Sequence, residues 1–254
     1  MEDIIYGLKD KVVLITGGSR GIGLELARSY LKEGAKVIIC SRKEENLSAA
    51  SDELKGGDSL LTVQAHVARM EDVDNLYKIL YEKFGRLDIL INNVGMNLFT
   101  PSVADSDPVL WQKIVDSNLN GAYFCSRKAA AIMKAQKSGK IISITSIAAR
   151  KASPGMGIYG IAKAGIEMLT KVLASELAPF NIQVNAVSPS MVRTDFSKLF
   201  WSNKDIHDHI IKSVPMGRIA EIIDVIHPVL FLSSAGASFI TGQTLVVDGG
   251  ATAV

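Results

Sequence analysis

The sequence has few of the features that mark secreted or membrane-spanning proteins. It contains only two cysteines, Cys40 and Cys125, which excludes a disulfide framework, and both lie in stretches where we expect reduced, buried thiols. No apolar run approaches the roughly 20 residues that a membrane-spanning helix needs. The segment Met1–Asp10 carries acids in place of the apolar core of a secretory leader. We therefore expect a cytoplasmic location.

An excess of charge of either sign is also lacking. The chain has 28 basic and 26 acidic side chains, for a net charge of +2, and the two signs are interspersed. Such a pattern favours neither nucleic acid nor an anionic membrane as a partner. No metal is expected at His207 and His209, because two residues at this spacing face apart on a helix and no second group of ligands lies nearby.

Short apolar, β-branched runs alternate along the chain with longer stretches of helical periodicity. Continuously apolar runs are typical of parallel strands that helices cover on both faces. Strand–helix alternation predicts right-handed crossovers and a doubly wound α/β fold with a parallel seven-stranded sheet, in one domain spanning residues 1–254. The seven expected strands are Lys11–Thr16, Lys36–Cys40, Leu60–Ala65, Leu87–Ile91, Lys140–Ile144, Ile182–Val187 and Thr244–Val247.

One long segment, Ser188–Ala220, breaks this alternation. Segments of this length inside a domain are usually functional, and we expect a substrate lid at about residues 190–219. Its aromatic residues Phe196, Phe200 and Trp201 have two interpretations. They either close over an apolar substrate or pack beneath the lid or in a subunit contact.

A glycine-rich turn, Thr16–Gly23, follows the first expected strand and opens a helix. Gly17, Gly21 and Gly23 permit a tight turn and a close approach of the backbone to a pyrophosphate, while the helix N-terminus offers free N–H groups. A glycine pattern alone is weak evidence, but the strand–turn–helix context predicts a dinucleotide site.

The end of the second expected strand indicates which dinucleotide binds. In sites for NAD an acidic residue about 20 positions after the glycines holds the ribose 2′-hydroxyl. Here Ser41 and Arg42 occupy that place, so that Arg20 and Arg42 can bind a 2′-phosphate. The alternative interpretation of Arg42 is a solvated loop charge. Together the two arginines favour NADP(H).

A second motif places a tyrosine and a lysine four residues apart on a helix. Tyr159 and Lys163 then lie one above the other, and an ammonium beside a phenol lowers the phenol pKa. Ser146 ends the fifth expected strand, at the sheet edge where α/β sites form. An ordinary helical Tyr–Lys pair is the alternative, but the glycine motif favours acid–base catalysis.

In combination these motifs resemble the short-chain dehydrogenase/reductase family in its single-domain branch. The resemblance covers Lys11 to Gly250 and includes Thr-Gly-x-x-x-Gly-Ile-Gly at Thr16–Gly23 and Asn-Asn-x-Gly at Asn92–Gly95. It implies a Rossmann-type fold with strand order 3-2-1-4-5-6-7 and a homodimer or homotetramer. The helices at Asn118–Gln136 and Gly157–Phe180 would form the subunit contact. Their close approach would use the small residues Gly160, Ala162, Ala164 and Gly165.

The resemblance also implies residue roles. Tyr159 would exchange a proton with the substrate, Lys163 would tune Tyr159, Ser146 would hold the substrate oxygen, and Asn118 would anchor a relay water. Two departures concern the cofactor site: His66 replaces an aspartate that contacts adenine, and Ser190 replaces a glycine. The implied cofactor-binding set is Gly17, Ser19, Arg20, Gly21, Ile22, Gly23, Ser41, Arg42, His66, Val67, Asn92, Gly95, Tyr159, Lys163, Pro189, Val192 and Thr194.

The function that follows is an NADP(H)-dependent transfer of a hydride between the nicotinamide and a ketone or secondary alcohol. The lid aromatics favour a medium-sized, largely apolar substrate. A 3-oxoacyl thioester reductase is an alternative, although the apolar Ala178–Phe180 segment lacks the basic residue that an acidic carrier protein would favour. A non-catalytic cofactor-binding subunit or regulator is a second alternative.

Overall fold

The computed structural model describes residues 6–253, which form a three-layer α/β domain. Seven parallel strands lie in the order β3-β2-β1-β4-β5-β6-β7, which confirms the predicted order. The order reverses between β1 and β4, where doubly wound sheets bind their ligands. The strands are β1 (Val12–Thr16), β2 (Lys36–Ser41), β3 (Leu60–Gln64), β4 (Ile89–Asn92), β5 (Gly139–Ile144), β6 (Ile182–Pro189) and β7 (Thr244–Val247).

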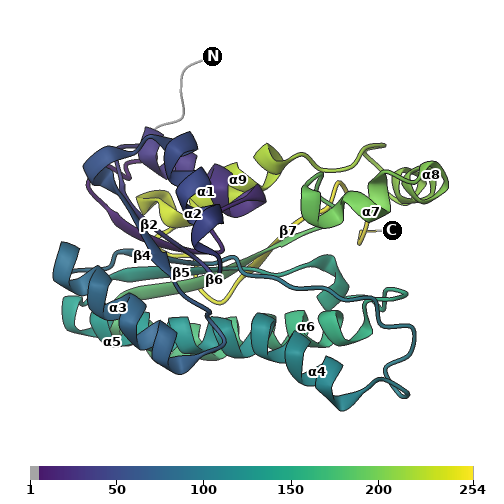
Figure 1. Ribbon diagram of the computed structural model, residues 1–254, viewed down its shortest axis with the longest axis horizontal. Helices are drawn as coiled ribbons and strands as arrows, with labels where there is room; N and C mark the ends of the chain where they lie inside the picture. The colour runs from purple at the N-terminus through teal and green to yellow at the C-terminus, as the bar shows by residue number, and fades with distance from the viewer. Residues whose placement is uncertain (1–5, 254) are drawn as a thin grey trace.

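Helices cover both faces of the sheet. One layer contains α1 (Gly21–Lys32), α2 (Glu44–Leu54) and α9 (Ile222–Ser233), and the opposite layer contains α3 (Met70–Phe84), α5 (Gly121–Gln136) and α6 (Gly157–Leu177) (Figure 1). The short helices α7 (Lys198–Trp201) and α8 (Lys204–Lys212) lie at one end of the sheet, and α4 (Pro108–Val115) leads into α5.

Alternation of side chains along each strand divides the core into two parts. Val13 and Ile15 of β1 belong to the core beneath α1, α2 and α9, whereas Val12 and Leu14 belong to the core beneath α3 and α5. Every residue of β1 is buried. A strand with two covered faces therefore has to be apolar throughout, and the uninterrupted Val-Val-Leu-Ile run of β1 satisfies this requirement.

The helix predicted at Asn118–Gln136 is not a regular α-helix throughout. A π-helical turn, Asp116–Asn120, joins α4 to α5. Such turns insert one extra residue into the helical repeat and are frequent at functional sites. Here the turn carries Asn118, whose side chain is 1% exposed. The helix that we predicted to end at Phe180 ends as an α-helix at Leu177, and Ala178–Phe180 forms a 3₁₀ turn.

The small residues on α6 pack inside the chain. A Cβ added to Gly160 would lie 2.6 Å from the Ala148 carbonyl oxygen, and one added to Gly165 would lie 2.9 Å from the Leu119 side chain. These two glycines therefore allow α6 to pack closely against its own domain.

Candidate active site

The glycine turn and the Tyr–Lys motif line one cleft. Its volume is about 770 Å³, within the range of small-molecule and cofactor sites. The cleft runs from Arg42 and His66 at one end to Ser146 and Tyr159 at the other, and lid residues between Met191 and Val214 form part of its wall. Of the residues predicted from sequence, those that line it are Gly17, Ser19, Arg20, Gly21, Ile22, Ser41, Arg42, His66, Val67, Gly95, Ser146, Tyr159, Lys163, Pro189, Val192 and Thr194.

The turn after β1 is held in a conformation that suits a phosphate. Gly17 has a φ of +67°, in the left-handed region that favours glycine. A Cβ at Gly23 would lie 2.3 Å from the Gly17 carbonyl oxygen, so only glycine fits where α1 begins. No side chain caps α1 and its first turn contains no acid. The N–H groups and the positive end of the helix dipole are therefore free for an anion.

Asn93 secures this turn from the neighbouring strand. Its side-chain Nδ2 donates hydrogen bonds to the carbonyl oxygens of Thr16, at 3.0 Å, and Gly17, at 3.2 Å. Sequence reasoning assigned the wall of the cleft to Asn92 instead. Asn92 is buried behind that wall, where its Nδ2 donates to Ser126 Oγ at 2.9 Å. The two asparagines alternate across β4, so only the second one faces the cleft.

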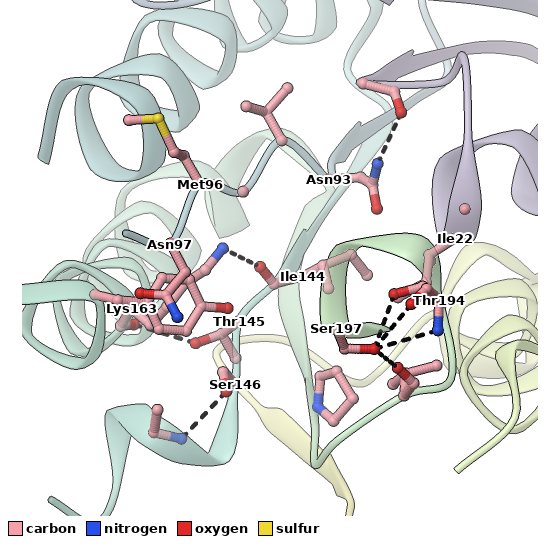
Figure 2. A pocket seen from close by; sticks show the side chains of 18 of the residues that line it. Ile22, Asn93, Met96, Asn97, Ile144, Thr145, Ser146, Lys163, Thr194 and Ser197 are labelled. Atoms are coloured by element: carbon pink, nitrogen blue, oxygen red, sulfur yellow. Dashed lines mark hydrogen bonds between the residues drawn. The ribbon is translucent and has the colours of Figure 1, made fainter. Parts of the chain in front are cut away.

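Lys163 reaches the cleft from α6 and is 2% exposed. Its Nζ donates a 2.9 Å hydrogen bond to the carbonyl oxygen of Ile144 at the end of β5 (Figure 2). Burial lowers the pKa of Lys163 to about 8, because desolvation penalises the charged ammonium. Lys163 is therefore protonated at pH 7 and loses its proton in mildly alkaline solution.

Tyr159 lies one turn before Lys163, next to Ser146. The lysine Nζ lies over the tyrosine ring, 5.5 Å from its centroid. Desolvation raises the pKa of Tyr159 to about 12, and the hydrogen bond with Ser146 acts in the opposite direction. Our expectation that Lys163 lowers this pKa is not met, because the ammonium is directed to the Ile144 carbonyl and the ring face. With this pKa, Tyr159 is protonated at neutral pH.

Asn118 supports the site from behind the cleft wall. Its Nδ2 donates to the carbonyl oxygens of Met96 and Ile114, both at 2.8 Å, and its Oδ1 accepts from the Met96 N–H at 3.2 Å. A Cβ at Gly95 would lie 3.7 Å from both Asn118 Oδ1 and Lys163 Nζ. Asn118 thus fixes the backbone at Met96. The neighbouring Gly95 lies close to both the Asn118 side chain and the Lys163 ammonium.

The lid borders the cleft mainly through aliphatic and small polar side chains, including Met191, Ser213 and Val214. Trp201 does not line the cleft: its Nε1 donates to the Thr194 carbonyl at 3.1 Å, and Arg193 lies over its ring. The side chains of Phe196 and Phe200 lie outside the described part of the structure. Trp201 therefore packs within the lid and does not close over the cleft, which agrees with the second of the two interpretations of the lid aromatics.

Two departures from the family pattern cause no backbone strain. Ser190, in place of glycine, has no positive φ, and its N–H donates to the Val247 carbonyl at 3.0 Å. His66, in place of aspartate, lines the adenosine end of the cleft and accepts a 3.2 Å hydrogen bond on Nδ1 from the Ala68 N–H. Ile147 and Met156, which flank the catalytic segment in the sequence, line the cleft, and residues that sequence reasoning did not single out there are Met96, Asn97, Ala148, Lys151 and Ser153.

A glycine turn at a helix N-terminus thus shares its cleft with a tyrosine, a serine and a lysine at the carboxyl edge of a Rossmann sheet, an arrangement typical of nicotinamide-dependent oxidoreductases. A family model described as enoyl-(acyl carrier protein) reductase matches residues 17–252. The chain belongs to the short-chain dehydrogenase/reductase family.

Individual relatives agree with this assignment. The chain is 36% identical to human dehydrogenase/reductase SDR family member 4 over 244 residues, covering 96% of this chain and 88% of the relative. It is also 36% identical to a 3-oxoacyl-[acyl-carrier-protein] reductase of Synechocystis, covering 96% of this chain and 97% of the relative. Among solved structures, a short-chain type dehydrogenase/reductase from Mycobacterium ulcerans superposes with a TM-score of 0.92 at 29% identity, covering 96% of this chain and 90% of that one.

Among residues 6–253, no helix is both long and apolar enough to cross a membrane. The same residues contain no group of three or more His, Cys, Asp or Glu side chains arranged to hold a metal ion. Both cysteines are buried and free.

Proposed function

We propose that the protein is an NADP(H)-dependent oxidoreductase that transfers a hydride between the nicotinamide and a ketone or secondary alcohol. The observation that carries the proposal is the convergence of Ser146, Tyr159 and Lys163 on the cleft that contains the glycine turn. When bound there, the cofactor supplies the hydride, and the protein supplies position, charge and a proton.

The protein's own groups have distinct tasks in the reduction of a ketone. Ser146 hydrogen-bonds the substrate oxygen and places it beside Tyr159. Because the pKa of Tyr159 is raised to about 12, its hydroxyl is protonated at neutral pH and can donate to the oxygen of the developing alkoxide. Lys163, with a pKa lowered to about 8, is the adjacent group that can return a proton to the phenolate.

A preference for NADP(H) over NAD(H) rests on charge. Ser41 ends β2 and Arg42 follows it, where an acid would hold the 2′-hydroxyl, and Arg20 lines the same cleft. Neither arginine has an ion-pair partner among the residues that the structure describes. Both guanidinium groups are therefore available to a phosphate.

The substrate end of the cleft supports a medium-sized substrate with a largely apolar body. Met96, Ile147, Met156, Met191 and Val214 contribute apolar side chains there. Polar side chains in the same wall include Asn97, Lys151, Ser153 and Ser213. Similarity to a 3-oxoacyl-[acyl-carrier-protein] reductase keeps 3-oxoacyl thioesters as the second candidate substrate class.

A homodimer or homotetramer is part of the proposal. Tyr123 of α5 and Ile161, Met168 and Val172 of α6 are between 43% and 58% exposed. A patch of this kind on two adjacent helices is typical of a subunit contact. A cytoplasmic location is proposed as well, and two unpaired thiols support it.

The test begins with fluorescence titrations of the purified protein with NADPH and NADH. We expect NADPH to bind at least about tenfold more tightly, a difference of about 1.4 kcal/mol. Turnover is then compared on apolar ketones and on acetoacetyl thioesters. Equal or tighter binding of NADH would contradict the cofactor preference, faster turnover of thioesters would favour the second class, and binding without any turnover would favour a regulator.

A further inference from the structure

Lys151 lines the cleft and is nevertheless exposed, which places it at the opening of the substrate end. It belongs to the turn that Ser146 begins. The Ser146 hydroxyl oxygen accepts a 3.2 Å hydrogen bond from the Ala148 N–H, and the Lys151 N–H donates to the Ile147 carbonyl at 3.3 Å. These hydrogen bonds hold the lysine at a set position relative to the serine that binds the substrate oxygen.

The C-terminal turn contacts the Lys151 ammonium without neutralising it. The lysine Nζ donates a 3.4 Å hydrogen bond to the carbonyl oxygen of Ala251, a residue that is 7% exposed and lines the same cleft. An ammonium has three N–H donors, and one neutral carbonyl uses only one of them. Among residues 6–253, Lys151 has no ion pair. Its charge and two of its donors are therefore available to a ligand.

Asp248 is the acid that acts on Lys151 at a distance, and its carboxylate is engaged within its own turn. Oδ1 accepts from the Gly250 N–H at 2.9 Å, and Oδ2 accepts from the N–H and the hydroxyl of Thr252 at 2.8 and 2.7 Å. Asp248 is not among the described residues that line the cleft. It therefore shapes the turn that carries Ala251 and does not occupy the place of an anionic ligand.

The cleft itself contains little negative charge. Asp195 is the one acid among its described lining residues. This residue directly follows Thr194, whose Cβ would lie 4.0 Å from a Cβ added to Gly21, so it is attached to the segment that borders the glycine turn. No hydrogen bond or ion pair joins it to Lys151 in the described part of the chain.

The other cations of the cleft already have a task in the proposed function. Arg20 belongs to the glycine turn, and Arg42 and Lys43 follow β2, so these three serve the phosphates of the cofactor. Lys163 is the catalytic lysine. Lys151 is thus the one described cation of the cleft without an assigned partner, and it stands at the opening through which the substrate enters.

We propose that the substrate is an oxo acid, or the corresponding hydroxy acid, whose carboxylate is bound by Lys151 while its ketone lies at Ser146 and Tyr159. The inference rests on the proposed function and deepens it, since it names the substrate class. The apolar side chains of the cleft contact the carbon chain of such a molecule, and the opening receives its charged end. A single ammonium is a compact point charge that matches the single charge of a carboxylate.

The test compares kcat/KM at saturating NADPH for methyl ketones of several chain lengths that end in a carboxylate, and for the primary amides of the same acids. Each amide has the size of its acid and no charge. For the preferred chain length, the wild-type protein should favour the acid about tenfold, the effect of one charge-assisted hydrogen bond. The preference should appear in KM and not in kcat, because the carboxylate is held equally in the ground state and the transition state.

Three variants assign that preference to Lys151. Lys151→Met should bring the ratio of acid to amide close to one, and Lys151→Arg should keep it within threefold of the wild-type ratio. The matched control is Arg150→Gln, which removes the neighbouring cation. Arg150 pairs with Glu167 at 3.2 Å and is not among the described lining residues, and glutamine can still donate to Glu167. This control should leave the ratio within twofold of wild type, and NADPH affinity should stay within twofold in all three variants.

The outcomes separate this inference from the function on which it rests. A wild-type protein that reduces no ketone would overturn both. A wild-type protein that reduces ketones with equal kcat/KM for acids and amides would overturn the inference and leave the proposed function standing. Equal losses of the ratio in Lys151→Met and Arg150→Gln would assign the preference to general surface charge. If Lys151→Met slows the coenzyme A thioester of acetoacetate more than the acids, the lysine binds a phosphate and the carboxylate assignment is wrong.

Discussion

Replacing the buried lysine of the site should stabilise the fold while it destroys activity. Lys163 is 2% exposed, and burial lowers its pKa from 10.5 to about 8. The difference between these two values corresponds to about 3 kcal/mol of folding free energy that the charged lysine costs at pH 7. Lys163→Met removes that cost but also removes the hydrogen bond to the Ile144 carbonyl, worth about 1 kcal/mol. The expected net stabilisation at pH 7 is about 2 kcal/mol.

The pH dependence gives the sharper test. Between pH 8 and 10.5 the unfolded chain binds more protons at Lys163 than the folded chain does, so wild-type stability rises with pH in this window. The advantage of Lys163→Met should therefore fall by about 2.5 kcal/mol between pH 7 and pH 10. Urea denaturation of the variant and the wild type, at equal protein concentrations and at each pH, measures this difference in unfolding free energy. Lys171→Met, at an exposed position on the same helix, is the control and should stay within about 0.5 kcal/mol of wild type.

Either of two results would refute this reasoning. If Lys163→Met destabilises the protein by 1 kcal/mol or more at pH 7, the ammonium is not under a desolvation penalty. If the difference between wild type and variant is the same at pH 7 and pH 10, the pKa of Lys163 is not lowered in the folded protein.

Two further predictions concern the glycine turn and the pH dependence of turnover. Gly23→Ala should weaken NADPH and NADH binding alike, by at least about tenfold, because the added Cβ would lie 2.3 Å from the Gly17 carbonyl oxygen and 2.6 Å from Asn93 Nδ2. Binding of either cofactor within twofold of wild type would show that the turn tolerates the methyl group. At saturating NADPH, kcat/KM for ketone reduction should fall about tenfold per pH unit above pH 8, as Lys163 loses its proton. A profile that stays level to pH 10 would exclude the lysine from the proton path.

The strands were predictable because a strand covered on both faces has to be apolar throughout. Thr244–Val247 matches the prediction at both ends, and β5 starts one residue earlier than predicted. The largest shifts are of two residues: β4 begins at Ile89 and not at Leu87, and β6 ends at Pro189 and not at Val187. Asp88 explains the late start of β4, because its carboxylate accepts from the Val12 N–H and pairs with Arg86, which ties this segment to the strand edge before the regular ladder begins.

Local departures from regular helix were not predictable from spacing. The π-helical turn at Asp116–Asn120 continues directly from α4 into α5, and tertiary contacts of Asn118 with Met96 accompany it. The lid helix α7 was not predicted, because four residues leave no periodic pattern to detect, whereas the lid helix expected around His207 and His209 is α8.

The chemistry-bearing residues of the site were predictable where a motif fixes their spacing, as for Tyr159 and Lys163. Residues that act through tertiary contact were missed. Asn93 carried a usable signal, since it is the second asparagine at a strand end and faces the opposite side from Asn92.

The most direct test of the central claim is the rate of NADPH oxidation by ketones in wild type and in Tyr159→Phe, which removes only the hydroxyl that donates the proton. Cofactor titration of both proteins serves as the control for binding. The account predicts unchanged NADPH affinity and a loss of turnover of about 10³-fold, the range of general acid catalysis. A variant that retains turnover within tenfold of wild type would contradict the assignment of Tyr159 as the proton donor.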